Sequence, residues 1–425
     1  MTAAAPSPRL HYAWIVAAVV FAMLLVAAGI RAAIGVLILP LEEEFGWSRA
    51  TISSAAALSI FFYGFVGPFA AAAVLRFGIV RTLLAALFLL ALGTMASLAM
   101  TRPWQLMVTW GLMLGVGAGV VSLPLATAIV NRWFLRHRGL VVGLLTAAMA
   151  AGQLIFLPSL ALLAEQGGWR PVALAVTICS AAVALAAFLL REYPADIGLA
   201  PLGGDRIEPP PPPSRANPLR AAIGVLYDVR GSRDFWLLGG TFFVCGLSTS
   251  GLVATHFIAY CFDNGIPETR GAALLAFIGI FNILGTTLSG WLTDRFDSRW
   301  LLFWYYGLRG LSLACLPFSG FDAVSLTIFA VFYGLDWIAT VPPTVRLAGD
   351  AFGKERAAVV FGWLLAMHQV GGAIAAFGAG FMRAALETYL QAFLISGIAC
   401  LVAAGMALAI RRAGSTPAAP APAVA

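Results

Sequence analysis

Three charged side chains stand inside long apolar runs of the sequence: Arg31, Arg309 and Asp336. A charge in the middle of a membrane-spanning helix costs roughly 2.5–3.5 kcal/mol on insertion scales, so it persists where it faces a cavity or a partner. By helical rise, Arg309 and Asp336 lie about 13 Å and about 15 Å from the same end of two consecutive runs. We therefore expect a buried ion pair, which is either purely structural or opened by a substrate or a proton.

Arg31 differs from that pair because no acidic residue stands at its depth in any other apolar run. One alternative is that its side chain extends outward to the membrane surface. The other is an anion site, since an unpaired guanidinium in a low-dielectric cavity strongly favours a carboxylate. Two arginines and one aspartate leave a residual positive charge in the apolar runs, which suits a monoanion better than a cation.

Other polar side chains in the same runs are further candidate substrate contacts. They are Tyr63, Gln153, His256, Asn282, His368 and Gln369. A histidine titrates near physiological pH, so His256 or His368 could carry a coupled proton. Each of these side chains could instead join neighbouring helices by hydrogen bonds. We prefer His368 and Gln369 as contacts because they lie near the middle of their run.

Composition indicates what surrounds these residues. Of the 425 residues, 61% are apolar and 11% are charged, whereas a soluble domain carries about 25% charged residues. The excess apolar surface must face a lipid bilayer. We attribute the net charge of +7 to arginines in loops rather than to nucleic-acid binding. The five cysteines predict no metal site, and with no HExxH or Walker A pattern we expect neither a cofactor nor an enzyme.

Twelve apolar runs are long enough to cross a bilayer as helices, which takes about 20 residues each. Their approximate limits are 13–40, 50–74, 80–101, 104–130, 139–164, 170–190, 235–261, 270–292, 300–318, 323–346, 358–382 and 386–410. They predict an all-α membrane protein with twelve transmembrane helices in two six-helix halves. In the fourth run, the spacing of Gly111, Gly115 and Gly119 predicts a face for close helix packing.

A polar segment separates the sixth run from the seventh and contains five consecutive prolines, Pro209–Pro213, which cannot be helical. Most of the 26 Lys and Arg residues fall on the side of this segment and of both termini, which places that side in the cytoplasm. We expect four parts: an N-terminal half (1–191), a cytoplasmic linker with a short surface helix (192–233), a C-terminal half (234–412) and a disordered tail (413–425).

The loop after the eighth run, residues 290–299, reads GWLTDRFDSR. It resembles the Gly-x-x-x-Asp-Arg-x-Gly-x-Arg loop of the major facilitator superfamily. The loop after the second run is similar, although Leu75 stands where the family usually has aspartate. The resemblance implies the major facilitator fold and alternating access. It also implies a cytoplasmic gate that includes Asp294, Arg295, Arg299, Arg76 and Arg81.

Two shorter stretches resemble the monocarboxylate and oxalate–formate branch of that superfamily. Residues 35–49, GVLILPLEEEFGWSR, are similar to its junction between helices 1 and 2, and residues 134–143, FLRHRGLVVG, to the start of its helix 5. The branch commonly places an arginine in helix 8, whereas residues 281–287, FNILGTT, carry no charge. Residues 146–153 lack the Gly-Pro-rich motif of many exporters in the superfamily, which favours uptake.

These patterns predict secondary transport of a small, monocarboxylate-like organic anion by proton symport or by exchange. Efflux of a drug-like or metallophore compound and a membrane sensor without transport are the alternatives. The expected partners are an anionic small molecule, the lipid bilayer and protons. We expect a monomer in a bacterial inner membrane, with both termini in the cytoplasm.

Overall fold

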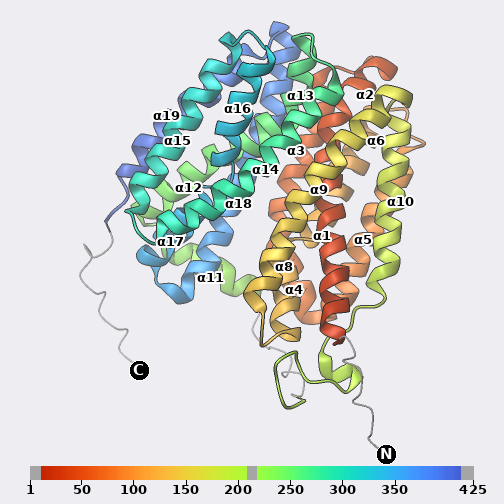
Figure 1. The fold of residues 1–425 in the computed structure, drawn as a ribbon, viewed down its shortest axis with the longest axis vertical. Helices are drawn as coiled ribbons and strands as arrows, with labels where there is room; N and C mark the ends of the chain where they lie inside the picture. The colour runs from red at the N-terminus through yellow and green to blue at the C-terminus, as the bar shows by residue number, and fades with distance from the viewer. Residues whose placement is uncertain (1–10, 208–217, 413–425) are drawn as a thin grey trace, which may run out of the picture.

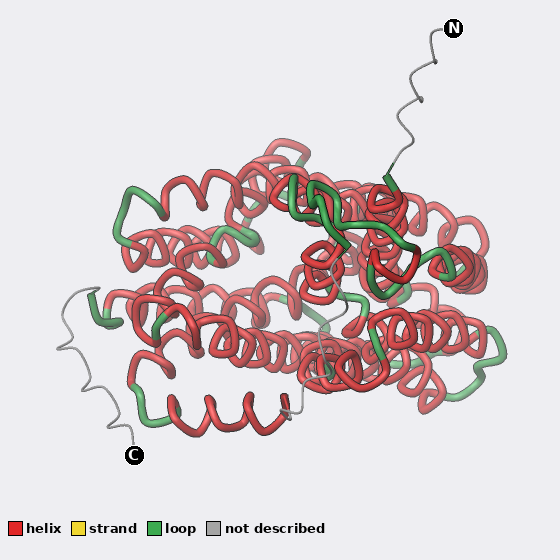
Figure 2. The backbone as a smooth tube through the Cα atoms, turned by 90° about the horizontal axis from the view of Figure 1, so that it is seen from below, coloured by secondary structure: helices red, strands yellow, loops and turns green. Residues whose placement is uncertain are grey.

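The computed structural model describes residues 11–207 and 218–412. The Pro209–Pro213 run and the tail 413–425 lie outside the described residues. Helix makes up nearly all of the described chain, and loops are mostly short connections between helices (Figure 2). In this part of the chain, extended backbone pairs only at the isolated bridge between Phe134 and Leu202.

The N half makes six crossings: α1, α3 with α4, α5, α6 through α8, α9, and α10. Its elements are α1 (Tyr12–Val36), α2 (Ile38–Phe45), α3 (Arg49–Phe65), α4 (Gly67–Phe77), α5 (Ile79–Ser97), α6 (Pro103–Leu106), the π-helical η1 (Met107–Met113), α7 (Leu114–Val120), α8 (Leu123–Trp133), α9 (Arg138–Gly167) and α10 (Trp169–Ala187). The short η2 (Pro194–Ile197) and α11 (Pro218–Val229) follow before the second half begins.

The C half makes six more crossings: α12 through α13, α14, α15, α16 with α17, α18, and α19. Its elements are α12 (Arg233–Gly246), the π-helical η3 (Leu247–Val253), α13 (Ala254–Asp263), α14 (Glu268–Thr293), α15 (Ser298–Cys315), η4 (Leu316–Phe318), α16 (Ala323–Asp336), α17 (Val341–Phe352), α18 (Lys354–Leu386) and α19 (Leu390–Leu408).

Within the described residues, nine helical stretches are by themselves long and apolar enough to cross a bilayer. The remaining crossings are α3 with α4, α6 through α8, and α15. The first two are interrupted, and a proline, which lacks an N–H donor, stands in the first turn of both α4 and α8. In α15, Arg309 lowers the mean hydropathy. The twelve crossings confirm the predicted all-α membrane fold of two six-helix halves.

The two halves lie side by side, the N half in red to yellow and the C half in green to blue (Figure 1). They contact each other along α3 with α18 and along α9 with α14. We call the end at which α1 begins and α19 ends the proximal end, and the opposite end the distal end. At the proximal end, the Tyr12 hydroxyl donates to the Leu189 carbonyl at 2.6 Å.

The predicted glycine face of the fourth crossing packs against α3. A Cβ on Gly115 would lie 2.6 Å from the Ser59 carbonyl oxygen, and one on Gly119 would lie 2.8 Å from that of Tyr63. Only glycine permits so close a backbone approach, which is typical of helix packing in lipid. The contact fixes the position of α3, whose residues Ser59 and Tyr63 line the cavity described next.

Candidate functional site

A cavity of about 80 Å³ lies between the two halves. Four of the predicted substrate contacts meet there: Arg31, Tyr63 and Gln153 from the N half and Gln369 from the C half. Its other lining residues are Ala32, Ile34, Ala56, Ser59, Ile60, Leu157, Ser250, Ala254, Thr255, Leu275 and Trp337. Because both halves supply its walls, a molecule bound here contacts both.

Arg31 on α1 faces this cavity, and its guanidinium carbon lies 4.3 Å from the centre of the Tyr63 ring on α3. A cation over an aromatic face gains about 0.5–2 kcal/mol, but the ring does not neutralise the charge. Among the described residues, no carboxylate forms an ion pair with Arg31. The site therefore combines an uncompensated positive charge with a largely enclosed space.

Neutral polar groups surround that charge. Gln369 is 7% exposed and packs against α3, where a Cβ on Gly64 would lie 2.5 Å from the Gln369 Cγ. The Thr255 hydroxyl donates to the Ser250 carbonyl at 2.9 Å across the widened turn of η3. Such π-helical turns are frequent at functional sites. These groups can donate to or accept from a ligand without adding charge.

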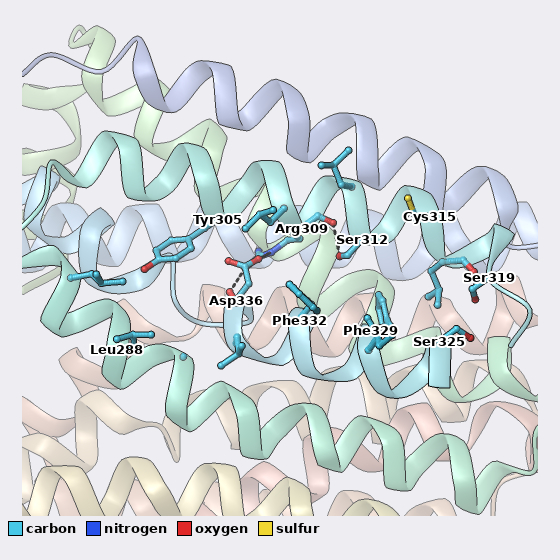
Figure 3. A pocket seen from close by; sticks show the side chains of 17 residues that line it. Leu288, Tyr305, Arg309, Ser312, Cys315, Ser319, Ser325, Phe329, Phe332 and Asp336 are labelled. Atoms are coloured by element: carbon cyan, nitrogen blue, oxygen red, sulfur yellow. Dashed lines mark hydrogen bonds and ion pairs between the residues drawn. The ribbon is translucent and has the colours of Figure 1, made fainter. Parts of the chain in front are cut away.

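Arg309 on α15 and Asp336 at the end of α16 point toward one another (Figure 3). The Arg309 Nε donates to Asp336 Oδ2 at 2.5 Å, and the two side chains are 0% and 9% exposed. Arg309 also donates to the carbonyl oxygens of Asp336 at 2.5 Å and of Trp337 at 3.2 Å. A cation at the carbonyls of a helix C-terminus stabilises that end of α16. The pair thereby supports Trp337, a wall of the central cavity.

A second, larger cavity of about 490 Å³ lies between α14, α15 and α16 (Figure 3). Its walls are mainly Leu, Ile and Phe side chains, and Leu308, Leu311 and Phe332 among them are exposed on the side of the molecule. The Arg309–Asp336 pair forms part of its lining. Because this space belongs to one half and is apolar, it suits a polar cargo less well than the central cavity does.

The remaining predicted contacts lie outside the central cavity. His256 is fully buried, with Nδ1 3.1 Å from the Tyr389 hydroxyl and Nε2 2.7 Å from the Ala376 carbonyl. The His368 ring lies 4.8 Å from that of Phe242, and its Nδ1 has no hydrogen-bond partner within the described chain.

Asn282 also has a local partner. Its Oδ1 accepts from the Ile338 N–H at 3.2 Å, in the turn between α16 and α17. It also accepts from the Thr286 hydroxyl at 3.1 Å. The structure thus places Asn282 at a helix break rather than in the cavity wall.

The residues of the predicted gate lie at the proximal end. Asp294 is 3.6 Å from Arg346, and Arg295 lies over the Trp291 ring at 4.1 Å. Arg299 pairs with Asp297 at 2.7 Å. This hydrogen bond from Arg299 holds the pKa of the Asp297 carboxyl below its ordinary value. In the N half, both gate arginines are exposed, and Arg76 lies 5.4 Å from the Phe77 ring while Arg81 stands in the first turn of α5.

Several contacts at the proximal and distal ends of the molecule are not predicted by the sequence. Glu192 accepts from the N–H groups of Ile79 and Val80 at 2.8 and 3.1 Å, which caps α5, and it also pairs with Arg132. At the distal end, Arg49 pairs with Asp263 at 2.7 Å. The members of each pair are far apart in sequence, so no spacing pattern could have revealed them.

Comparison with known proteins places this geometry among transporters. Residues 19–376 match the family model of the Major Facilitator Superfamily. The MFS-type transporter YcxA of Bacillus subtilis is 25% identical over 423 residues, which cover 95% of this chain and 95% of that protein. Monocarboxylate transporter 11 of Homo sapiens is 28% identical over 405 residues, which cover 91% of this chain and 80% of that protein.

A solved structure shows the same fold. It is the crystal structure of a bacterial homolog of the human lysosomal transporter Spinster, in an inward-facing and unoccupied conformation. The TM-score is 0.75 at 16% sequence identity, and the match covers 95% of this chain and 97% of that one.

Proposed function

The chain belongs to the major facilitator superfamily, and on that premise we propose that this multi-pass membrane transporter carries a small organic anion of the monocarboxylate type. The observation that carries the proposal is Arg31, a guanidinium that lines a cavity between the halves and pairs with no carboxylate of the described chain. Membership of a transporter family, together with this cavity, makes transport rather than catalysis the activity.

Charge balance supports an anionic cargo. The Arg309–Asp336 pair is internally neutral, so Arg31 is the source of the positive charge at the cavity. Arginine binds a carboxylate through two parallel hydrogen bonds, and the surrounding amide and hydroxyl groups can satisfy the rest of a small polar molecule. The names of several relatives, monocarboxylate transporters, agree with this class.

Size supports a small cargo. A cavity of about 80 Å³ accommodates only a few non-hydrogen atoms. Because the walls come from both halves, closure around a bound molecule and opening at either end fit alternating access about a central site. We extend the proposal to proton symport or anion exchange by a monomer in a bacterial inner membrane, with the proximal end in the cytoplasm.

The test is uptake of labelled lactate, pyruvate or oxalate into proteoliposomes, with and without a pH gradient. We expect accumulation of at least one of them, and stimulation by an inward proton gradient in the case of symport. Arg31→Gln should lower uptake at least tenfold, because loss of a charged hydrogen-bond pair costs about 1.5–3 kcal/mol. Arg31→Lys, which keeps the charge without the bidentate geometry, should retain part of it.

The matched control is Arg206→Gln, which removes an exposed arginine from the segment between the halves. It should transport like the wild type. Accumulation that is unchanged in Arg31→Gln would remove Arg31 from the site, and failure of all three anions to accumulate would overturn the proposed cargo class.

A further inference from the structure

Four charged side chains meet at the distal end, two from each half. Arg49 begins α3 and Glu42 lies on α2, both in the N half, while Asp263 ends α13 and Arg383 lies in the last turn of α18, both in the C half. Arg49 donates to Asp263 from Nη1 at 2.7 Å and from Nη2 at 2.8 Å. This bidentate pair joins the two halves.

The pair is held in a tight and largely dry contact. The Arg49 side chain is 6% exposed and that of Asp263 is 17% exposed. Next to them, α18 approaches α3 so closely that a Cβ on Gly380 would lie 2.9 Å from the Arg49 carbonyl oxygen. The Arg49 Nη1 also donates to the Tyr389 hydroxyl at 3.4 Å. Charge-assisted bonds in such surroundings are stronger than exposed ones.

Helix stability does not explain where these charges stand. Arg49 is the first residue of α3 and Asp263 is the last residue of α13. A cation at a helix N-terminus and an anion at a helix C-terminus both oppose the helix dipole. Each residue is therefore unfavourable for its own helix and favourable for the contact between the halves. At the proximal end, by contrast, the Arg346–Asp294 pair lies within one half.

Each member of the pair has a second partner in its own half. The Arg49 Nε donates to Glu42 Oε2 at 2.8 Å, and the Arg383 Nε donates to Asp263 Oδ2 at 2.7 Å. If the halves move apart, the two bonds between Arg49 and Asp263 break. Arg49 then keeps Glu42, and Asp263 keeps Arg383, so neither charge is left without a counter-charge.

We propose that these four residues form the distal gate of the transporter, a latch in which Arg49–Asp263 holds the gate closed and Glu42 and Arg383 stabilise the two charges when it is open. The proposal requires only that the halves separate at this end, so it is independent of the cargo. The proposal predicts that substitutions of neighbouring charged residues shift the gate in opposite directions, some towards the open state and some towards the closed state.

The directions follow from which state each contact belongs to. The bonds between Arg49 and Asp263 exist only in the closed state, so Arg49→Gln and Asp263→Asn favour opening. Loss of Glu42 or Arg383 leaves a charge unpaired only in the open state. Glu42→Gln and Arg383→Gln therefore favour closure, although they remove charges that touch the same pair.

The test is a distance measurement between spin labels on cysteines introduced at Gln166 and Ala323, exposed residues at the distal ends of α9 and α16. The exposed Cys315 is replaced by serine throughout. Full-length protein in nanodiscs is measured by pulsed electron paramagnetic resonance, without added substrate. We expect Arg49→Gln and Asp263→Asn to raise the ratio of open to closed distances roughly tenfold, and Glu42→Gln and Arg383→Gln to lower it severalfold.

Two further variants make the result decisive. Arg170→Gln breaks the Arg170–Glu44 pair, which lies at the same end but within the N half, and should leave the ratio unchanged. Arg49→Lys, which keeps the charge, should open the gate less than Arg49→Gln and covers the case in which the latter misfolds. An unchanged ratio in Arg49→Gln, or a shift of all four variants in one direction, would overturn the latch. If the wild type transported no anion but the variants still shifted the ratio as expected, the result would count against the proposed cargo and not against the latch.

Discussion

Two arginines within the membrane-spanning helices act differently because different groups face their guanidinium ions. Arg309 is saturated: Asp336 supplies a carboxylate, and the carbonyls of Asp336 and Trp337 accept further hydrogen bonds. Arg31 lies over the Tyr63 ring, which attracts a cation without neutralising it. The unfavourable desolvation of Arg309 is therefore offset inside the protein, whereas that of Arg31 is offset best when an anion is bound. We therefore propose that Arg309 serves stability and that Arg31 serves binding.

Removal of either member of the buried pair leaves a charge without a partner. We expect Asp336→Asn and Arg309→Met each to lower the free energy of unfolding by about 3–5 kcal/mol. The double variant Arg309→Met/Asp336→Leu should lose less than either single variant, because it leaves no buried charge. Thermal unfolding of the purified protein in detergent measures this order. The exposed pair Arg346–Asp294 provides the control, since Arg346→Gln should cost no more than about 1 kcal/mol.

The same variants separate a structural pair from a functional one. If Asp336→Asn kept its stability but lost the pH dependence of transport, the pair would act in proton coupling rather than in support of α16. If Arg309→Met were clearly less stable than Asp336→Asn, and the double variant no more stable than Arg309→Met, the bonds from Arg309 to the backbone carbonyls would outweigh the ion pair.

At the residue scale, the sequence predicts the partners of charged side chains within the membrane better than the partners of neutral polar ones. An arginine and an aspartate at equal depth in consecutive helices can hardly avoid one another in lipid, so Arg309 and Asp336 could be expected to meet. Asn282 and His256 can satisfy their hydrogen bonds with whatever backbone lies nearby, and sequence does not say which. Arg49 is read from sequence as a loop charge because its partner Asp263 is 214 residues away.

At the scale of elements, the break between α16 and α17 depends on α14. The Asn282 side chain accepts from the Ile338 N–H, and the Ser289 hydroxyl donates to the Ala339 carbonyl at 2.6 Å. Between them, a Cβ on Gly285 would overlap the Leu335 carbonyl, so glycine is required there. One face of α14 thus satisfies the backbone groups that the break frees, as a break within lipid requires.

We expect Asn282→Ala to leave the Ile338 N–H without an acceptor and to lower the free energy of unfolding by about 1–3 kcal/mol. Thermal unfolding measures this loss. Uptake kinetics show whether Trp337, which precedes Ile338 and lines the central cavity, has moved. The control is Thr287→Ala on the exposed face of α14, where the hydroxyl bonds only to its own helix; it should change stability by no more than about 0.5 kcal/mol. Equal stability of the two variants would mean that water replaces the Asn282 side chain.

The prolines in the sequence indicate where a helix is disturbed, but not whether it ends there. Pro342 and Pro343 indicate a disturbance in the tenth crossing, and α17 indeed starts just before them at Val341. Pro158 gives the same signal, yet α9 runs unbroken from Arg138 to Gly167. A proline removes one hydrogen bond, and whether the helix ends there depends on donors and acceptors from neighbouring helices, such as Arg309 and Asn282.

At the scale of the whole molecule, the fold class follows from composition because lipid permits few alternatives. A backbone within the bilayer must satisfy its own hydrogen bonds, so long apolar runs become helices. Apolar length indicates twelve crossings in the sequence, although three of them are interrupted or carry charge in the structure. The bias of Lys and Arg supports this count, because the loss of one helix would invert every later loop.

An even number of crossings places the start of α1 and the end of α19 at one face, and from the excess of Lys and Arg we propose that this proximal face lies in the cytoplasm. Exposed residues in the loops of each end test this assignment. A cysteine introduced at Arg102, in the distal loop between α5 and α6, should react with a membrane-impermeant maleimide in intact cells, whereas one at Arg206, at the proximal end, should react only after permeabilisation. The chain without an introduced cysteine sets the background. The reverse pattern would invert the membrane orientation while leaving the fold intact, and labelling of both positions in intact cells would show that the number of crossings between them is even rather than odd.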